Sequence, residues 1–340
     1  MGHPAINNKT PFVLETLFLA DEDGHPVLAT VVKATYQIVA DSHLILAEKQ
    51  TSVSLTGEYR DEPELASIKY EPEIAFFKPA TDIVLIGHAY APRQGTTQVD
   101  VSLEVGRLKK TVRAFGDRWW MKSMNTIAQT QPVPFERIPL IYERAFGGWE
   151  RNDPDPDKHS FEPRNPIGVG FKTNKEYLKD AMRLPNLEDP GQLIKDIMDK
   201  PKPAGFGFIA PHWQPRAALA GTYDKTWMEQ RMPLLPKDFD RRFFNAAPVD
   251  QVVSGYLKGN ESVEIMNVSP RGKIGFNLPD VPPLQCRVAV RNQDVQNIQS
   301  LLDTLIINTD ENLLFLIWRA NLALRNGPHD VASIEISLDE

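Results

Sequence analysis

The sequence contains a single cysteine, Cys286, among 340 residues. One thiol cannot form a disulfide within the chain, so a disulfide-stapled secreted fold is excluded. Cysteine and histidine also never recur at the close spacings that structural zinc sites use. This cysteine usage is typical of a protein from a reducing compartment.

Long apolar runs are missing as well. The longest, such as Leu313–Trp318, fall far below the ~20 residues that a membrane-spanning helix needs. Residues 1–21 do not combine a basic region with an apolar run, as a secretory signal does. We therefore expect a cytoplasmic protein that has no membrane partner.

Clustered positive charge is a third absence. The net charge is −7, and the densest basic stretch holds only Arg107, Lys109, Lys110 and Arg113. Binding to nucleic acid depends on clustered Lys and Arg that displace counterions from phosphates. We therefore expect no nucleic-acid partner. The apolar share of 41% and the charged share of 24% are ordinary for a folded globular protein, which excludes disorder as the main state.

Two β-hairpins are predicted in the first third of the chain. Residues 27–38 are rich in β-branched side chains and lead through a polar turn at 40–43 into residues 44–46. In the second hairpin, at 97–115, apolar and polar residues alternate, which places one side of the strand in a core. The nearly all-apolar segment 81–91 is predicted to be a central strand.

The β pattern returns after residue 262. Alternation is visible at 263–265 and again at 285–291. Residues 301–308 and 313–318 flank a polar turn and predict a third hairpin.

The middle of the chain, residues 132–248, holds 16 of the 28 prolines. Proline removes a backbone donor and is excluded from helix interiors, so this region must be mostly irregular. Its many Phe, Trp, Tyr and Leu residues indicate that it is nevertheless packed. Two short helices are expected within it: one over Lys175–Arg183, and one that starts near Asp189-Pro190 and ends at Pro201.

These patterns predict a mainly β fold, with antiparallel, sandwich-like sheets and a proline-rich middle that carries one or two short helices. Strands do not alternate with helical patterns of 10–15 residues, which argues against a helix-rich α/β fold. We treat residues 1–340 as one domain with three approximate sub-regions: an N-terminal β unit (1–131), the packed middle (132–248) and a C-terminal β unit (249–340).

No residue pattern in the sequence forms a catalytic or cofactor constellation. The glycine-containing stretches 165–170 and 205–207 lack the spacing of a nucleotide-binding loop, and a G-x-S-x-G elbow is absent. His88, His212 and Cys286 have no identifiable catalytic partner. Four carboxylates remain as candidates without an evident pairing: Asp82, Glu104, Asp117 and Glu143. We expect no cofactor and no metal.

The tryptophans provide candidates for binding. Trp119 and Trp120 must point to opposite faces if they are extended, so one of them is expected to be exposed. Exposed Trp and Arg side chains often anchor protein interfaces, although Trp also stacks on sugars or simply packs in the fold. Our candidate partner contacts are Arg118, Trp119, Trp120, Trp149, Trp213 and Trp227. Trp318 ends an aliphatic strand and is expected in the core.

A set of short stretches, found in order along nearly the whole chain, resembles a known bacterial family. The clearest of them are Lys78–Asp82, Phe115–Trp119, Tyr142–Gly148, Asn165–Gly168, Gly205–Gly207 and Phe243–Pro248. The family was long catalogued as a domain of unknown function. Its members accompany type VI secretion effectors that carry PAAR-like domains.

The resemblance implies an adaptor or chaperone that is not an enzyme. Such a protein holds a cognate effector in the cytosol and helps to load it onto the VgrG spike. Two other functions stay open from the residues alone. A carbohydrate hydrolase would need a deep pocket with two carboxylates of raised pKa, and a sugar-binding module would need a row of exposed Trp side chains.

Overall fold

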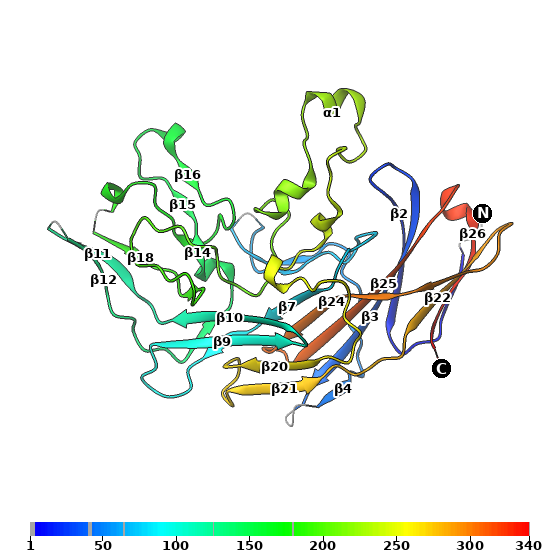
Figure 1. Cartoon of the computed structure of the whole chain (residues 1–340), viewed down its shortest axis with the longest axis horizontal. Helices are drawn as coiled ribbons and strands as arrows, with labels where there is room; N and C mark the ends of the chain where they lie inside the picture. The colour runs from blue at the N-terminus through cyan, green and yellow to red at the C-terminus, as the bar shows by residue number, and fades with distance from the viewer. Residues whose placement is uncertain (1–3, 40–42, 64, 125, 179, 340) are drawn as a thin grey trace.

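The computed structural model describes residues 4–39, 43–63, 65–124, 126–178 and 180–339. The chain is mostly β, and most strand pairs are antiparallel. Figure 1 shows the larger sheets lying along one side of the molecule, with most of the middle region (green to yellow) along the other. Within the described ranges, no helix combines the length and apolar composition needed to cross a bilayer.

The central feature is a six-stranded sheet built from both ends of the chain. Its strands in spatial order are β2 (Val13–Ala20), β3 (Pro26–Ile38), β25 (Leu313–Ala323), β24 (Leu301–Asn308) and β7 (Asp82–Ile86), with β4 (Leu44–Leu46) paired to part of β3. The pair β24–β7 is parallel, and the other pairs are antiparallel. The predicted hairpins 27–46 and 301–318 are thus confirmed, although the turn residues 40–42 lie outside the described residues.

Two further sheets also mix the two ends of the chain. The five-stranded sheet runs β19 (Leu187–Glu188), β10 (Leu108–Phe115), β9 (Gln98–Val105), β20 (Ser262–Met266) and β21 (Lys273–Asn277). The four-stranded sheet runs β1 (Ala5–Asn8), β26 (Val331–Leu338), β22 (Leu284–Val290) and β23 (Gln296–Gln299). One large core joins residues of all three sheets, because the alternating apolar residues of each point inward. Trp318 lies in this core, as expected, and so does Cys286.

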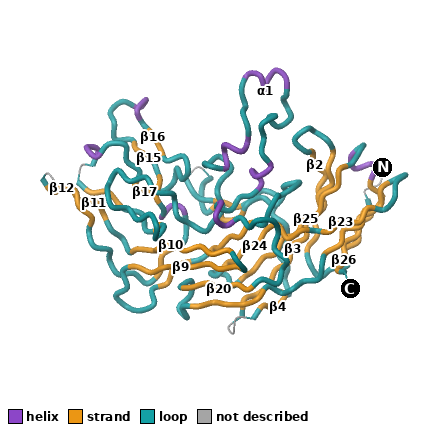
Figure 2. The backbone as a smooth tube through the Cα atoms, in the orientation of Figure 1, coloured by secondary structure: helices purple, strands orange, loops and turns teal. Residues whose placement is uncertain are grey.

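The middle region is mainly loops with short strands and helical turns, as Figure 2 shows. Its small sheets, two of which include strands from residues 88–129, are the following: β18 (Ala181–Arg183) with β11 (Trp119–Ser123) and β12 (Thr126–Gln129); β13 (Arg137–Pro139) with β8 (His88–Tyr90); β14 (Phe146–Gly147) with β17 (Val169–Gly170); and β15 (Trp149–Glu150) with β16 (Ser160–Phe161). A two-stranded sheet of β5 (Glu58–Tyr59) and β6 (Ile68–Tyr70) lies outside this region. Short 3-10 turns occur at 142–144, 156–158, 175–177, 216–220, 241–244, 249–251 and 327–330. A second, smaller core that includes Trp120, Phe146 and Phe171 stabilises this region.

Both helices predicted in the middle region are wrong. Lys175–Arg183 forms a single 3-10 turn at Lys175–Tyr177, and Ala181–Arg183 is a strand, because it pairs with Trp119–Met121 of β11. The segment after Asp189 is a series of turns, in which the Asp189 carboxylate accepts from the Gly191 N–H.

The α-helix of the structure lies elsewhere in the middle region. It is α1 (Lys225–Gln230), and the side chain of Asp224 caps it by accepting from the Trp227 N–H at 2.8 Å.

The predicted central strand 81–91 is divided in two and lies at an edge. Gly87 separates β7 from β8, and a Cβ there would come 2.1 Å from Thr309 Oγ1, so only glycine fits this approach. All five residues of β7 are buried nevertheless. The middle region and the residues just after it cover this edge: Leu85 N–H donates to Phe206 O at 3.2 Å, and Gln251 Nε2 donates to Ile83 O at 2.7 Å.

Candidate functional site

A groove of about 750 Å³ opens on one face of the six-stranded sheet. β24 and β25 provide its floor, residues 71–78 one wall, and the β2–β3 turn together with residues 233–235 another. Apolar side chains such as Ile306, Ile317 and Phe244 line much of it. We call it the α1 groove, because its rim includes part of the segment 221–240 that carries α1. Figure 1 shows this segment, the α1 excursion, standing out from the body of the molecule.

Three buried ion pairs lie at the floor and wall of the groove, and each contributes one lining residue: Glu73, Lys78 or Arg319. Lys33 pairs with Glu73 at 2.7 Å, Lys78 with Asp82 at 2.6 Å, and Arg319 with Asp303 at 2.6 Å, and each of the six side chains is more than 90% buried. We call these the floor pairs. Buried charges persist only when they are paired and hydrogen-bonded, and each of these has further partners.

Hydrogen bonds from the floor pairs fix the wall of the groove. Arg319 Nη1 donates to Ala75 O at 2.5 Å and to Glu73 O at 3.1 Å, while Lys33 Nζ also donates to Ser52 O. Glu73 in turn accepts from the Ser54 N–H at 2.8 Å. The segment 73–75 is therefore tied to the sheet by charge-assisted bonds, and the wall is preorganised.

Asp82 links the floor to the middle region. Its carboxylate accepts from Asn245 Nδ2 and from the Ala246 N–H, each at 2.8 Å, in addition to Lys78. Lys78 Nζ donates to Thr304 Oγ1 at 2.8 Å. Of the sequence candidates, Asp82 is thus a structural centre that joins β7 to the 241–248 turn.

The α1 excursion is held against the β2–β3 turn by Arg231 and, just after the excursion, by Arg241. The Arg231 guanidinium donates to Asp23 Oδ1 at 2.7 Å, to Glu22 O and to Leu235 O, and Arg241 pairs with Glu22 at 2.7 Å. Within the excursion, Trp227 Nε1 donates to Leu234 O at 2.8 Å. These bonds give the excursion a defined shape, and Phe239 near its end packs against Phe243 and Phe244.

The tip of the excursion exposes apolar side chains. Tyr223 is 52% exposed, Met228 61% and Met232 62%. Methionine is flexible and polarisable, and it is over-used at surfaces that bind varied partners. Exposed apolar groups beside an apolar groove mark a site that a polypeptide can cover. We call these three side chains the excursion tip.

Two of the three carboxylates that line the groove, Glu71 and Glu73, are held by cations, and the third, Asp21, accepts from His25. Glu73 belongs to a floor pair, and Glu71 accepts from Arg216 Nη2 at 2.5 Å. A glycosidase needs one carboxyl group that is free to give a proton and a second that attacks or activates water. Glu71 and Glu73 are bound in ion pairs instead, so the groove is better suited to binding an apolar group than to this reaction.

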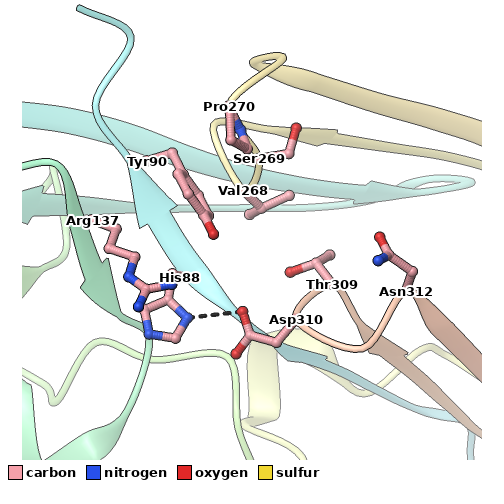
Figure 3. A pocket seen from close by; sticks show the side chains of 9 residues that line it. All are labelled: His88, Tyr90, Arg137, Val268, Ser269, Pro270, Thr309, Asp310 and Asn312. Carbon is pink, nitrogen blue, oxygen red and sulfur yellow. Dashed lines mark hydrogen bonds and ion pairs between the residues drawn. The ribbon is translucent and has the colours of Figure 1, made fainter. Parts of the chain in front are cut away.

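A smaller pocket of about 430 Å³ lies where β8 and β13 meet the β20–β21 and β24–β25 turns. Figure 3 shows His88, Tyr90 and Arg137 on one side and Asp310 below them. His88 Nδ1 lies 2.8 Å from Asp310 Oδ1, the only interaction drawn between the residues of this view. Ser269 lies on the other side of Tyr90, and its hydroxyl points away from His88, so this pocket does not form a nucleophile–histidine–carboxylate triad.

Three of the six candidate contacts predicted from the sequence are buried. Arg118 is 5% exposed, stacks on Phe115 and forms an ion pair with Glu188. Burial raises the pKa of Glu188, and the Arg118 guanidinium opposes this shift. Trp120 belongs to the smaller core, and Trp213 is only 1% exposed. These three side chains pack the fold and are not available to a partner in this structure.

The other three candidates lie apart from one another. Trp119 is half-buried in β11, so of the Trp119–Trp120 pair neither side chain is fully exposed. Trp149 is 46% exposed and stacks on Phe161 at a ring distance of 4.5 Å. Only Trp227 belongs to the α1 excursion, where Tyr223 contacts it edge-on. Asp117 and Glu143 accept hydrogen bonds from Asn186 and Ser67, respectively.

Sequence reasoning missed the groove and the excursion tip. A local signal for the helix was present, because Asp224 precedes it as a capping residue. The spacing of Met228 and Met232, four residues apart, also fits one side of a helical turn. Nothing local, however, indicated that these methionines lie outside the core.

The comparisons with known proteins identify the family. The family model described as an uncharacterized protein conserved in bacteria (DUF2169) matches residues 23–319. The chain belongs to the DUF2169 family. No curated protein and no solved structure shows a significant match to the chain. The matched range contains all of the α1 excursion, the floor pairs and Trp227.

Proposed function

We propose that this DUF2169 protein is a non-enzymatic adaptor or chaperone. It binds a cognate type VI secretion effector with a PAAR-like domain in the cytosol and assists its loading onto the VgrG spike. The resemblance of the stretches from Lys78–Asp82 to Phe243–Pro248 supplies the identity of the partner. The α1 groove supplies the physical means.

The observation that carries the proposal is the contrast between the buried charges of the groove and the exposed apolar side chains of the excursion tip. Its charges are paired internally, whereas the excursion tip leaves three apolar side chains in water. Covering exposed apolar surface is favourable by about 25 cal/mol per Å² removed from water. A partner segment that covers the tip and enters the groove gains this free energy without breaking a floor pair.

The role of a chaperone follows from the same surface. A secreted effector with an apolar or strand-edge segment aggregates if that segment stays uncovered before loading. A groove with a preorganised wall and an exposed apolar rim shelters such a segment and releases it to another surface. Binding in this way requires no bond to be made or broken.

Expression of the neighbouring effector with and without this protein tests the proposal. We expect the effector to co-purify with the chain, and its soluble and secreted fractions to fall when the chain is absent. An effector that stays equally soluble and is equally secreted without the chain contradicts the proposal. Turnover of a carbohydrate by the purified chain contradicts it as well.

A further inference from the structure

The strand β2 ends the six-stranded sheet without a neighbour on its outer side. It pairs with β3 over all eight of its residues and with no other strand of the described chain. At the opposite end of the same sheet, Gln251 and Phe206 cover β7 by hydrogen bonds. The two ends of the sheet therefore differ: β7 is covered by hydrogen bonds from neighbouring segments, whereas β2 has no strand on its outer side in the described part of the chain.

The register of the β2–β3 hairpin shows which backbone groups face outward. The Asp21 N–H donates to His25 O at 3.0 Å, and Pro26, which has no N–H, lies opposite Ala20. In an antiparallel pair, hydrogen-bonded and non-bonded residue pairs alternate. Val13, Glu15, Leu17 and Leu19 therefore bond to β3. The N–H and C=O groups of Leu14, Thr16, Phe18 and Ala20 point away from the sheet.

The contacts just before β2 confirm this register. Phe12, the preceding even-numbered residue, accepts from Asn8 Nδ2 at 2.8 Å and donates its N–H to Thr10 Oγ1 at 3.2 Å. Its outward groups are thus satisfied by neighbouring side chains. From Leu14 to Ala20, the outward groups have no hydrogen-bond partner in the described part of the chain.

β2 also lacks the features that usually protect an edge strand. It contains no proline and no lysine, and its sequence VLETLFLA has one charged residue, Glu15. Proteins commonly protect such edges with charges, prolines or bulges, because an open edge pairs with other chains. An eight-residue apolar edge with continuous register is therefore a template for an added strand.

The odd-numbered residues of β2 lie on the groove side of the sheet. Residues directly opposite each other on neighbouring strands share a face. Val31 lies opposite Glu15 on one side and opposite Arg319 on the other, so Glu15 shares the face of the floor pairs. Leu19 and Ala20 themselves line the α1 groove. A strand added to β2 thus presents every second side chain to the face that continues into the groove.

The charges on this face indicate the chemistry of the added strand. The cations of the floor, Lys33, Lys78 and Arg319, are each paired with a carboxylate. Glu15 has no ion-pair partner among the residues that the structure describes. The charge left for an incoming segment is therefore negative, and a basic side chain complements it.

We propose that β2 captures an extended segment of the bound polypeptide by strand addition. The segment carries apolar side chains at alternate positions and a basic residue opposite Glu15. Backbone hydrogen bonds to Leu14, Thr16, Phe18 and Ala20 provide the register, and the alternate side chains point toward the α1 groove. This inference rests on the proposed function, because it specifies how the effector is held.

Amide hydrogen exchange, followed residue by residue with the effector as the probe, tests the register. In the free protein, the outward amides of Leu14, Thr16, Phe18 and Ala20 exchange fast, while those of Glu15 and Leu17 are protected by β3. In the complex, we expect the exchange rates of the outward amides to fall at least about 100-fold. A complex that leaves these four amides as fast as before overturns the strand-addition proposal and leaves the proposed function intact.

Two substitutions in β2 test the same contact by affinity. Thr16→Pro removes an outward N–H and leaves the bonds to β3, so we expect capture to weaken at least about tenfold, with cooperative unfolding retained. Glu15→Lys is expected to weaken capture by a similar factor, because it opposes the basic residue of the segment. Unchanged affinity in both variants overturns the proposal.

A matched control lies at the edge of the five-stranded sheet. The Asn267 N–H donates to Gly272 O, so the same alternation directs the Gly275 N–H outward from β21. Gly275→Pro removes an outward N–H there, and we expect it to leave capture unchanged. A loss of capture equal to that of Thr16→Pro contradicts a specific role for β2.

Two remaining outcomes show whether the strand-addition proposal alone fails or the proposed function fails as well. If the free chain is a dimer whose outward β2 amides are already protected, a second copy occupies the edge and the proposal is overturned. If the effector does not bind the chain at all, the proposed function fails and the strand addition fails with it.

Discussion

The floor and the tip of the α1 groove reverse the usual placement of charge and apolar surface. The floor buries six charged side chains, and the excursion tip exposes Tyr223, Met228 and Met232. Both arrangements are costly for an isolated chain, because buried charges lose hydration and exposed apolar groups order water. They differ in how the cost is offset. The charges of the floor find their partners inside the chain, whereas the side chains of the tip stay more than half exposed.

We infer from this difference that the floor pairs support the fold, whereas the excursion tip serves to bind a partner. The floor pairs fix the wall of the groove through Arg319 and Glu73, so their loss should be felt as lost stability. The tip contributes little to the core, so its loss should be felt as lost binding. Three predictions test this division, beginning with the largest expected effect, and a fourth, smaller one concerns His212.

Asp303→Ala should strongly destabilise the fold, because it leaves the Arg319 guanidinium buried without its carboxylate. Removal of one partner of a buried pair costs about 3–5 kcal/mol. We expect a loss of this size in the free energy of unfolding from urea titration. The control is Glu264→Ala, which breaks the exposed Lys273–Glu264 pair and should cost less than about 1 kcal/mol. Equal losses in the two variants contradict the role of the floor.

Trp227→Ala should loosen the excursion while sparing the body of the protein. The substitution removes the hydrogen bond to Leu234 O and the edge contact with Tyr223. We expect proteolytic cleavage within residues 221–240 to become at least about tenfold faster, because local opening costs less. The urea midpoint of the body should hardly change. Cleavage at the rate of the parent protein would show that the excursion is held by other contacts.

Met228→Ser combined with Met232→Ser should weaken effector binding without lowering stability. Both side chains are more than half exposed, so their truncation removes little from the core. Loss of an apolar anchor is expected to reduce affinity at least about tenfold in a titration, equal to about 1.4 kcal/mol. Met124→Ser is the matched control, since Met124 is 93% exposed on a separate hairpin. Equal effects of the two changes argue against a localised site.

Stability should fall slightly as the pH drops below about 6.5, through His212. Burial lowers the pKa of His212 below its ordinary 6.5. The unfolded chain therefore binds this proton more readily than the folded chain, and acidification favours unfolding. Protonation also removes the acceptor of Trp213 Nε1, 3.0 Å away. Because this side chain is only partly shielded from solvent, we expect the free energy of unfolding to fall by less than about 1 kcal/mol between pH 7.5 and 5.5.

His212→Gln tests this assignment, because glutamine keeps an acceptor for Trp213 and does not titrate in this range. Urea titrations of the variant and the parent at the two pH values should show a smaller pH dependence in the variant. An identical dependence would assign the effect to another group.

The strands that could be predicted are those whose signal is local. Alternation at 98–105 and the β-branched run at 27–38 determine which residues face the core, whatever the rest of the chain does. The predicted helix after Asp189 failed because its N–H groups bond to side chains instead. Ile194 N–H donates to Glu188 Oε2 at 2.8 Å, and Ile194 then packs in the smaller core. The hydrophobic periodicity of a sequence does not predict such a contact.

The groove could not be predicted because its parts are distant in sequence. Lys33 and Glu73 are 40 residues apart, and Arg216 pairs with Glu71 across 145 residues. The burial of Trp213 and the exposure of Met232 follow from the same long-range packing. A prediction from residue type alone therefore selected the tryptophans as partner contacts and did not select the methionines.

Photo-crosslinking from the excursion tip tests the central claim most directly. A photoreactive amino acid is placed at Met232 in one variant and at Met124 in the other, and each is irradiated with the effector present. We predict a covalent product with the effector from position 232 and none from position 124. Products of equal yield from both positions, or a product from position 124 alone, contradict a binding site at the α1 groove.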